Sequence, residues 1–493
     1  MNRSSTIQYT DAAVIGAGVL GCFAARALTA LDIRVAVIEQ REDVSTGITR
    51  ANTGIIYTGC DNRPGSLKAK MCAEANRGFE DLCRDLGVRF SRCGSLMAAF
   101  GPRAEKVLYK KLGFGEENGV EGLKILSRKE VLELEPGISA DVTAALYAPG
   151  TGTVDPWELG IAAFENAKAN GAEFYFGREV KHMEREEGGF LLETERETFH
   201  ARTVINCAGL SSDAVREMLM VPSVRIFPTA ADYLVLDDTV NGYVNHVIFH
   251  EPEEKGKGLT LVPTVDGNLL VGPTDRDLLS ASPGATDRDG LKELEELCGK
   301  IVPDLPISEQ IRNFSAIRPN SYNVTKKDGV WIPTDRSIND FTILSEEGLI
   351  SLIGIKTPGL SCAAELGKHA AGLAEEYLGH PGPNPCFDPV RKAPPRLHGM
   401  QEEDRAALIK KDPDYGRIVC LCGDISYGEV RDAIRRGAVT LDGVKRRAGT
   451  GMGRCQGARC IKEIIGMLAK AQSVLPEDVT KDGAGSEILE VQP

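Results

Sequence analysis

A glycine-rich segment near the N-terminus constrains the fold of this chain more than any other feature. Four apolar residues, 12–15, predict a buried strand. Gly16, Gly18 and Gly21 follow at the spacing G-x-G-x-x-G, which suits a tight turn, a close approach to phosphates and close helix packing. A second apolar strand ends at Glu39, whose carboxylate can accept hydrogen bonds from a ribose diol. Together these features predict a dinucleotide-binding α/β unit with a helix N-terminus facing the pyrophosphate, and both FAD and NAD fit it.

Composition narrows the class of protein. The chain has 493 residues, of which 42% are hydrophobic and 26% charged, as expected for a soluble protein of two to four domains. Its net charge of −13 argues against a nucleic-acid-binding protein. We find neither a signal-peptide pattern nor an apolar run long enough for a transmembrane segment. The 13 scattered cysteines favour reduced thiols in the cytoplasm over a disulfide framework.

Distant segments are predicted to complete the nucleotide domain. The polar loop 45–59 is expected to lie along the cofactor. Cys207-Ala208-Gly209 follows a further apolar strand, and residues 349–361 form another strand followed by a glycine turn and then a helix. We therefore assign an FAD-binding domain to 1–87, 150–222 and 330–380, with an extended segment beginning at Val180.

The intervening and C-terminal segments have different patterns. Short strands separated by turns in 88–149 and 223–329 predict a mostly antiparallel substrate or cap domain. A proline-rich linker is expected at 381–416, a small helical domain at 417–475 and a tail at 476–493. The predicted fold class is therefore α/β and α+β: a Rossmann-like domain, an antiparallel-sheet domain and a small helical domain.

Four cysteines in the helical domain predict a four-thiolate site. Cys420 and Cys422 form one close pair, and Cys455 and Cys460 form the other. Four thiolates suit a 2Fe–2S cluster, with two per iron, or a single tetrahedral zinc ion. Zinc pairs more often have two intervening residues, and neither pair does, so the spacing favours iron–sulfur over zinc or unligated thiols. The cysteines elsewhere, such as Cys72, Cys83 and Cys298, are expected to be packing residues.

Several motifs resemble known families. Residues 10–380 resemble the FAD-dependent oxidoreductases of the D-amino-acid-oxidase-like superfamily. Residues 417–467 resemble the bacterioferritin-associated-ferredoxin-like 2Fe–2S domain. The motifs that carry the first resemblance are the glycine fingerprint with Glu39, the loop 49–59, Gly152-Thr-Val-Asp-Pro156, Cys207-Ala-Gly209, Ala316-Ile-Arg-Pro319 and Gly354-Ile-Lys-Thr-Pro-Gly359.

Two families within this superfamily are most similar. Residues 64–72 and 93–96 resemble the L-2-hydroxyglutarate dehydrogenases and oxidases, but Tyr57 and Thr260 stand where that family usually has histidine. Residues 245–248 and the cysteine domain resemble the catalytic subunit of anaerobic glycerol-3-phosphate dehydrogenases. The resemblance thus implies an FAD-dependent dehydrogenase that oxidises the secondary alcohol of a small anion, with sn-glycerol 3-phosphate preferred. L-2-hydroxyglutarate, or an amine or imino acid, is the alternative substrate.

The resemblance also implies candidate site residues. Arg318 would hold the anionic end of the substrate, and Lys356 would contact the substrate or stabilise the reduced flavin; a strand-capping arginine and a surface lysine are the structural alternatives. His246 is a candidate base, with His250 and Tyr57 as weaker alternatives, although a lone histidine on a strand is more often structural. The expected cofactor contacts are Gly16, Gly18, Gly21, Glu39, Gln40, Thr49, Asn52, Thr53, Val180, Ala208, Gly209, Gly354, Lys356, Gly359 and Leu360.

The two predicted cofactors imply an electron-accepting partner. A hydride carries two electrons, a 2Fe–2S cluster carries one at a time, and a flavin can convert between the two. We therefore expect an acceptor protein subunit or a quinone-linked partner, through which the chain could associate with a membrane. A basic group near the cysteines is expected to dock an acidic partner or to lie against the chain's own flavin domain: Lys445, Arg446, Arg447, Arg454 and Arg459. A module that senses redox state rather than transferring electrons is the alternative from another functional class.

Overall fold

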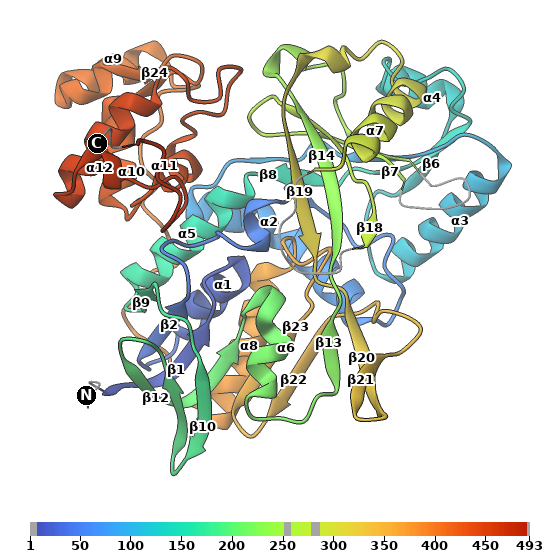
Figure 1. Ribbon diagram of the computed structural model, residues 1–493. Coiled ribbons are helices and arrows are strands. Elements are labelled where there is room, and N and C mark those ends of the chain that lie inside the picture. The colour runs from blue at the N-terminus through green and yellow to red at the C-terminus, as the bar shows by residue number, and fades with distance from the viewer. Residues whose placement is uncertain (1–6, 251–257, 278–285, 491–493) are drawn as a thin grey trace.

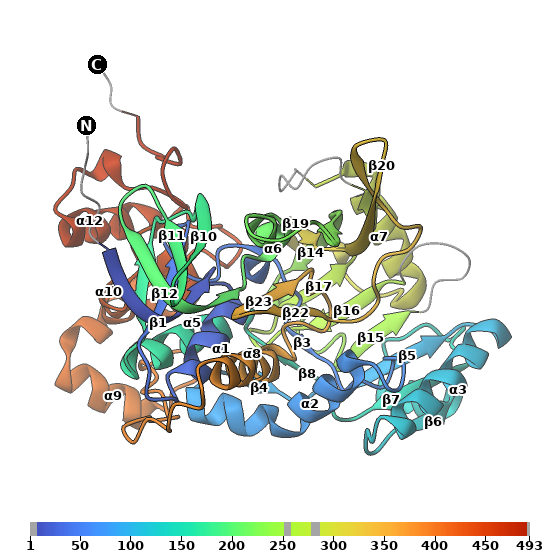
Figure 2. The same ribbon diagram turned by 90° about the horizontal axis from the view of Figure 1, so that it is seen from below.

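Two large sheets and a helical C-terminal unit make up the architecture (Figure 1). The computed structural model describes residues 7–250, 258–277 and 286–490. The nucleotide sheet lies beside the C-terminal unit, and the second sheet, here called the cap sheet, lies on its other side (Figures 1 and 2). The predicted α/β and α+β fold class is confirmed, whereas the domain boundaries given above stay predictions.

The nucleotide sheet forms around β1, which is buried because strands pair with it on both sides. Ala13 lies in register with Val204 on one parallel neighbour and with Ala36 on the other. Apolar side chains fill both faces, which explains the continuous apolar run in the sequence. In spatial order the strands are β10 (His182–Glu186), β11 (Gly189–Glu193), β12 (Thr198–Asn206), β1 (Ile7–Ile15), β2 (Val35–Glu39) and β9 (Glu173–Phe176), and β23 (Leu349–Ile353) pairs with β12 and with β22 (Thr342–Glu346).

Helices from distant parts of the chain cover one face of this sheet. α1 (Val19–Leu28) packs closely against α8 (Ala363–Tyr377), where a Cβ atom at Gly367 would lie 2.6 Å from the carbonyl carbon of Phe23. α5 (Pro156–Ala169) and α2 (Leu67–Leu86) join the same apolar core. This packing brings the loop before α8 next to the glycine turn before α1, although more than 300 positions separate them in the sequence.

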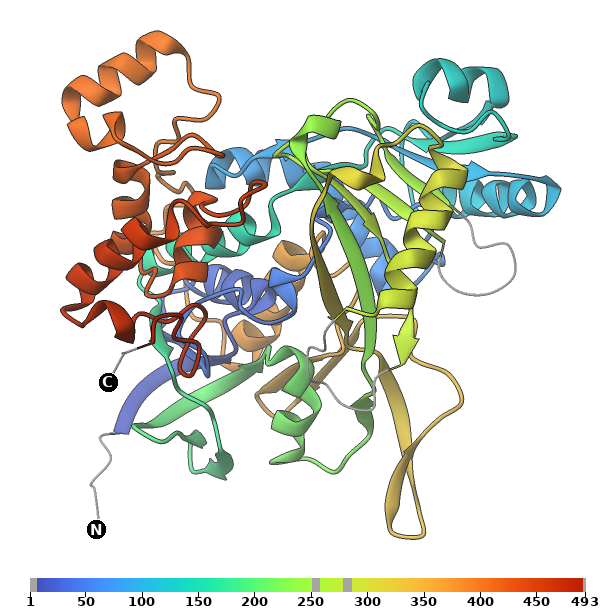
Figure 3. The ribbon, with the colours of Figure 1, turned by 45° about the horizontal axis from the view of Figure 1, so that its top comes forward.

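The cap sheet is mostly antiparallel, as predicted. Its longest pairing joins β14 to β19, and β15 and β5 form a parallel pair. α7 (Arg288–Ile301) lies alongside β14 and buries Leu294 and Cys298 in the cap core (Figure 3). The strands are β18 (Arg276–Asp277), β14 (Thr229–Leu236), β17 (Leu269–Gly272), β16 (Thr260–Pro263), β15 (Val247–His250), β5 (Ser95–Ala99), β7 (Ala144–Ala148) and β6 (Lys124–Ser127), with β19 (Gln310–Arg318) on β14.

Smaller elements connect the two large sheets. One short sheet joins β3 to β8 and β4, and another joins β13 to β20 and β21. Of three further helices, α3 and α4 pack against β6 and β7 of the cap sheet, and α6 packs against β12 and β23 of the nucleotide sheet (Figures 1 and 2). Their bounds are β3 (Ile55–Ile56), β4 (Phe90–Ser91), β8 (Gly152–Val154), β13 (Val224–Ile226), β20 (Ser321–Lys327), β21 (Val330–Pro333), α3 (Pro102–Glu117), α4 (Arg128–Leu134) and α6 (Ser212–Glu217).

The proline-rich segment after α8 is bound to the nucleotide domain. The Asp32 N–H donates to Gly382 O at 2.8 Å, and Asn166 Nδ2 donates to Asp388 O at 3.0 Å. Arg391 is buried and bonds to Glu165 and to the carbonyl oxygen of Leu86. The segment therefore follows the surface closely, and α9 (Glu402–Lys411) lies within the region predicted as linker.

The C-terminal unit has its own apolar core, formed by side chains such as Val430, Val444 and Leu468. A Ser426–Glu429 capping box starts α10, and Thr440 caps α11. No helix in the described ranges has both the length and the apolar character of a bilayer span. The elements of the unit are β24 (Ile418–Cys420), β25 (Ile425–Ser426), α10 (Tyr427–Arg435), α11 (Leu441–Ala448) and α12 (Ile461–Gln472).

Candidate active site

A cavity of about 930 Å³ opens where the nucleotide sheet meets the cap sheet. The glycine turn, the loop after β2 and the loop before α8 line it on the nucleotide side. Residues of β15, β16 and β19 line it on the cap side. Its lining, which runs from Glu39 to the cap strands, suits a dinucleotide and a small substrate together.

The glycine turn has the geometry of a phosphate-binding turn. Gly16 has a φ of +97°, and a Cβ atom there would lie 2.6 Å from the carbonyl oxygen of Cys207. A Cβ atom at Gly21 would lie 1.8 Å from the carbonyl oxygen of Gly16, so Gly21 serves helix packing. The space next to Gly18 is open, since a Cβ atom there would have the Thr49 hydroxyl, at 3.6 Å, as its nearest neighbour. This turn therefore leaves backbone N–H groups of α1 next to the cavity.

Glu39 lies at the end of β2 and is 8% exposed. Its Oε2 accepts the Ala17 N–H at 2.7 Å, and its Oε1 accepts the Arg41 N–H at 2.8 Å. Burial raises the pKa of this carboxyl, although the two N–H groups act in the opposite direction. The backbone bonds hold the carboxylate beside the cavity with further lone pairs available for a ribose.

Most of the predicted cofactor contacts line the cavity. Gly21 and Gly354 do not; Gly354 has a φ of +61° and packs against Ser321. The functional roles of all these residues stay predictions. Those that line the cavity are Gly16, Gly18, Glu39, Gln40, Thr49, Asn52, Thr53, Val180, Ala208, Gly209, Lys356, Gly359 and Leu360.

Arg318 and Lys356 both line the cavity, from opposite sides of the domain junction. Arg318 is the last residue of β19, and its Nη1 lies 3.4 Å from Asp275 Oδ1. Lys356 Nζ donates to Asn320 Oδ1 at 3.0 Å. Two cations that face one cavity favour an anionic ligand.

The candidate base does not line the cavity, and its role stays a prediction. His246 is not among the cavity-lining residues, and its Nδ1 lies 2.8 Å from Oε2 of the fully buried Glu135. That carboxylate also accepts the backbone N–H groups of residues 245 and 246, so the pair is a structural contact behind the cap sheet. His250 and Tyr57 do line the cavity. Burial raises the pKa of Tyr57, which keeps its hydroxyl protonated.

Two cavity residues were missed by the sequence analysis. Lys68 is 5% exposed, and its ammonium lies 5.7 Å from the centroid of the Phe341 ring. Among the described residues its ammonium makes no hydrogen bond or ion pair, although its backbone N–H donates to Asp340 Oδ1 at 2.9 Å. Asn62 Nδ2 is likewise buried with no acceptor among them. Lys68 lies four positions before Cys72 and seven before Ala75, which places it on the buried stripe of α2. This helical spacing was the sequence signal that could have indicated its burial.

The four C-terminal cysteines come together in two spatial pairs. Cys422 Sγ lies 3.5 Å from Cys455 Sγ. Contact with the Cys460 thiol, together with backbone N–H groups including Gly451, lowers the pKa of Cys420 to about 5. Each spatial pair thus joins one cysteine of the first sequence pair to one cysteine of the second.

This arrangement fits two irons better than one metal ion. Within 7–250, 258–277 and 286–490, no three His, Cys, Asp or Glu side chains converge as ligands of a single ion. Two separated sulfur pairs match a 2Fe–2S cluster with two thiolates per iron. Backbone N–H groups around Cys420 and Cys455 would stabilise the thiolates of such a cluster.

Three of the basic residues near the cysteines contact the rest of the chain. Arg446 and Arg447 pair with Asp43 beside the nucleotide sheet, and Arg454 Nε donates to Asp237 Oδ2 at 2.8 Å at the end of β14. Arg459 is exposed. The basic group was expected either to dock an acidic partner or to lie against its own chain. The second expectation holds for Arg446, Arg447 and Arg454.

Comparisons with known proteins agree with this geometry. The family model "FAD dependent oxidoreductase" matches residues 11–373, and the model "BFD-like [2Fe-2S] binding domain" matches residues 418–470. A glycerol 3-phosphate dehydrogenase of Caloramator mitchellensis is 39% identical over 97% of this chain and 98% of its own length. The human mitochondrial L-2-hydroxyglutarate dehydrogenase is 29% identical over 55% of this chain and 62% of its own. The solved structure of a Mycoplasma pneumoniae L-alpha-glycerophosphate oxidase with bound FAD has a TM-score of 0.70 and 25% identity, and covers 78% of this chain and 99% of that one.

Proposed function

The chain belongs to the FAD-dependent oxidoreductase family and carries a C-terminal 2Fe–2S domain, and from this premise we propose that it is a dehydrogenase of sn-glycerol 3-phosphate. The product would be dihydroxyacetone phosphate. The observation that carries the proposal is the cationic lining of the cavity: Arg318, Lys356 and the buried Lys68, whose ammonium forms no ion pair among the described residues. A buried ammonium that lacks a direct ion pair is stabilised by an anionic ligand that supplies one.

The phosphate would be held by these donors. The Arg318 guanidinium can grip two oxygens at once, and its only close acid is Asp275 at 3.4 Å among the described residues. Lys68 and the unpaired Nδ2 of Asn62 would donate to further oxygens. Lys356, held by Asn320, would stay close to the substrate and the isoalloxazine ring.

The substrate hydroxyl must lose a proton as its carbon loses a hydride. Bound FAD supplies the hydride acceptor, and a 2Fe–2S cluster passes electrons on singly. We assign the proton acceptor to His250, because it lines the cavity and His246 does not. Tyr57, kept protonated by burial, would instead donate a hydrogen bond to the substrate oxygen.

The cofactor contacts follow from the same cavity. Glu39 would accept the ribose hydroxyls, and the N–H group of Gly18 would face the pyrophosphate, whereas the Gly16 N–H donates to Ile38 O at 2.8 Å. The loop before α8, including Gly359 and Leu360, would face the isoalloxazine ring. Cys420, Cys422, Cys455 and Cys460 would bind the cluster.

Electrons would leave through the C-terminal unit. Leu421 is 68% exposed, and Cys422 and Arg459 are also exposed, so this edge of the cysteine site is open to a partner. We propose an acceptor protein subunit or a quinone-linked partner there, and a cytoplasmic location. The thirteen cysteines all lie in the described part of the chain as free thiols, which supports a reducing compartment.

L-2-hydroxyglutarate is the second candidate substrate. The observation that favours it is the separation of the cationic groups between β19 and α2, which could hold the two carboxylates of a dicarboxylate. The relatives of that name match just over half of this chain. An amine or imino acid with a single carboxylate would leave one of the cationic groups unpaired.

Anaerobic flavin reduction tests the proposal directly. Purified protein is mixed with sn-glycerol 3-phosphate, glycerol, L-2-hydroxyglutarate or proline while the flavin absorbance is followed. We expect rapid bleaching by sn-glycerol 3-phosphate alone. Glycerol is the matched control, since it has the same alcohol without the phosphate. Rapid bleaching by another compound, with none by sn-glycerol 3-phosphate, would overturn the assignment.

A further inference from the structure

The loop after β2 is bound by a helix of the C-terminal unit. Arg447 donates to both oxygens of Asp43, with Nη1–Oδ2 and Nη2–Oδ1 distances of 2.6 and 2.7 Å. Arg446 Nη2 donates to the same carboxylate at 3.2 Å. The side chains of Asp43, Arg446 and Arg447 are 3%, 4% and 0% exposed. Two helix residues thus bury their charges on one acid located about 400 positions earlier in the sequence.

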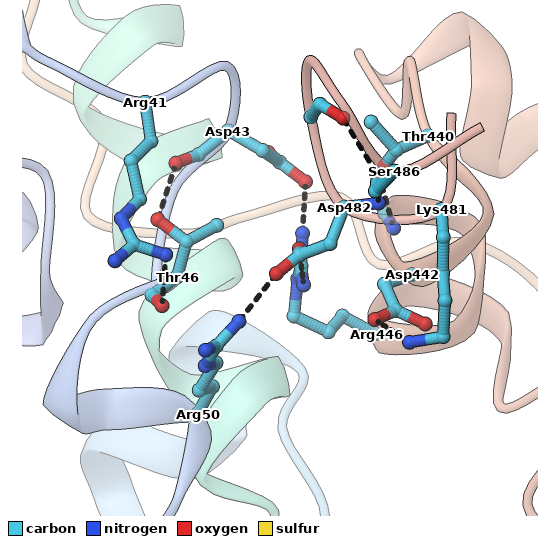
Figure 4. Close-up of polar contacts among 12 residues, drawn as sticks. Arg41, Asp43, Thr46, Arg50, Thr440, Asp442, Arg446, Lys481, Asp482 and Ser486 are labelled. Atoms are coloured by element: carbon cyan, nitrogen blue, oxygen red, sulfur yellow. Dashed lines mark hydrogen bonds and ion pairs between the residues drawn. The ribbon is translucent and has the colours of Figure 1, made fainter. Parts of the chain in front are cut away.

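A second anchor lies seven residues further along the same loop, at Arg50. Asp482, in the segment after α12, accepts from Arg446 Nη1 at 3.2 Å and also pairs with Arg50 (Figure 4). The Asp482 N–H donates to Ser486 Oγ at 2.8 Å. The Asp442 N–H donates to Lys481 O at 2.8 Å, which ties this segment to α11. Figure 4 shows Arg446 between the two acids, Asp43 and Asp482.

The chain between the two anchors lines the cofactor cavity. Gly47, Ile48 and Thr49 face it, and Thr49 Oγ1 accepts the Val19 N–H at 3.1 Å at the start of α1. The Ser45 N–H donates to Ala17 O at 2.9 Å, directly after the glycine turn. A displacement of Asp43 or Arg50 would therefore move groups that touch both the cavity and the N-terminus of α1.

The buried charges make the contact sensitive to the loss of one member. Burial alone would raise the pKa of Asp43, but Arg447 and Arg446 outweigh it and hold the pKa below its usual value. Removal of the acid leaves the Arg447 guanidinium without its carboxylate in a nearly dry interface, whereas Arg446 keeps its contact with Asp482. The 43–50 loop and α11 would then separate or admit water.

We propose that Asp43, Arg446 and Asp482 are positioning residues for FAD, through which the 2Fe–2S domain clamps the cofactor loop. Retention of FAD in the nucleotide domain then depends on the docked C-terminal unit. The cluster domain is part of the flavin site and not only a carrier of its electrons. This inference concerns FAD affinity and does not depend on which substrate is oxidised.

The test measures FAD binding in the full-length protein. Asp43→Asn and Asp482→Asn are compared with Arg454→Met, which removes two other ion pairs of the C-terminal unit, with Asp237 and Glu309 of the cap region and away from the loop. FAD is removed, and the dissociation constant is obtained by titration of flavin fluorescence. We expect about a tenfold weaker FAD affinity in both loop variants, and an unchanged affinity in Arg454→Met.

A second readout separates positioning from general destabilisation. The midpoint of thermal unfolding is measured with and without FAD, together with bound iron. A positioning role predicts that the FAD-induced rise in the midpoint shrinks in Asp482→Asn, a partly exposed site where folding should persist. An unchanged FAD affinity in both loop variants, or an equal loss in Arg454→Met, would overturn the proposal.

Discussion

The sulfurs of Cys422 and Cys455 lie 3.5 Å apart across 33 positions of sequence. Cys422 is exposed, whereas Cys420 and Cys460 are buried against the core of the C-terminal unit. A cluster held by the four thiolates would therefore have an inner edge at Cys420 and Cys460 and an outer edge at Cys422 and Cys455. The outer edge lies next to the exposed Leu421, which makes it the natural exit for electrons.

Replacement of an outer-edge cysteine should uncouple the two half-reactions. We expect Cys422→Ser to lose bound iron and acceptor reduction, while substrate still bleaches whatever FAD remains bound. Cys386→Ser is the matched control, because Cys386 is an exposed thiol in the proline-rich segment. Iron content, visible absorbance and stopped-flow reduction measure the outcome. Full iron content in Cys422→Ser would contradict the ligand assignment.

Lys68→Met should weaken substrate binding without harming the fold. Loss of a charged hydrogen bond of about 1.5–3 kcal/mol corresponds to roughly a ten- to hundredfold higher substrate dissociation constant. The substrate-free protein should be as stable or more stable, because a buried ammonium has been replaced by an apolar chain. Lys70→Met, exposed on the same helix, is the control. Both are measured by anaerobic flavin reduction and thermal unfolding; an unaltered dissociation constant would exclude Lys68 from the anion site.

Arg318→Lys tests whether the fork of the guanidinium matters beyond its charge. The variant keeps one positive charge but loses the two-oxygen grip, so we expect kcat/KM for flavin reduction to fall about tenfold or more. Arg312→Lys lies on the same strand but contacts Gln456 in the C-terminal unit, and it should leave this half-reaction unchanged. Equal rates in both variants would argue for a strand-capping role of Arg318.

His250→Gln should slow flavin reduction at saturating substrate by about a hundredfold, the usual contribution of a general base. His246→Gln is the discriminating comparison, since that ring contacts Glu135 and not the cavity. His246→Gln should lower the thermal stability, with little change in the rate of flavin reduction per bound FAD. The reverse pattern would restore His246 as the base.

Asp155 should make stability fall with rising pH. Burial, followed by the nearby Glu158 and Asp266 carboxylates, raises the pKa of Asp155 from 3.8 to about 7. Between these values the folded state binds more protons than the unfolded chain, so the free energy of unfolding decreases by at most about 1.4 kcal/mol per pH unit. Asp155→Asn keeps the N-cap acceptor of α5 and should remove this slope. Parallel pH profiles of denaturant unfolding for the two proteins would refute the shift.

Local patterns in the sequence were sufficient for much of the fold. The glycine spacing before α1, the buried run of β1 and the acid at Glu39 depend on neighbours within one βαβ unit, where spacing and periodicity dictate conformation. The same holds for the helix from Leu67 and for the two cysteine pairs as a thiolate site. The cofactors followed from these patterns, since a turn and a set of thiolates are chemical groups at fixed short spacings.

Only the tertiary structure decided which distant groups meet. His246 and His250 are four residues apart, yet the fold buries one on Glu135 and places the other at the cavity. The crosswise pairing of the cysteines and the Asp43–Arg447 contact join residues that periodicity treats as unrelated. Periodicity indicates which face of an element is buried but not what it is buried against. The stability of a buried charge depends on the group that it is buried against, because that partner sets its electrostatic energy.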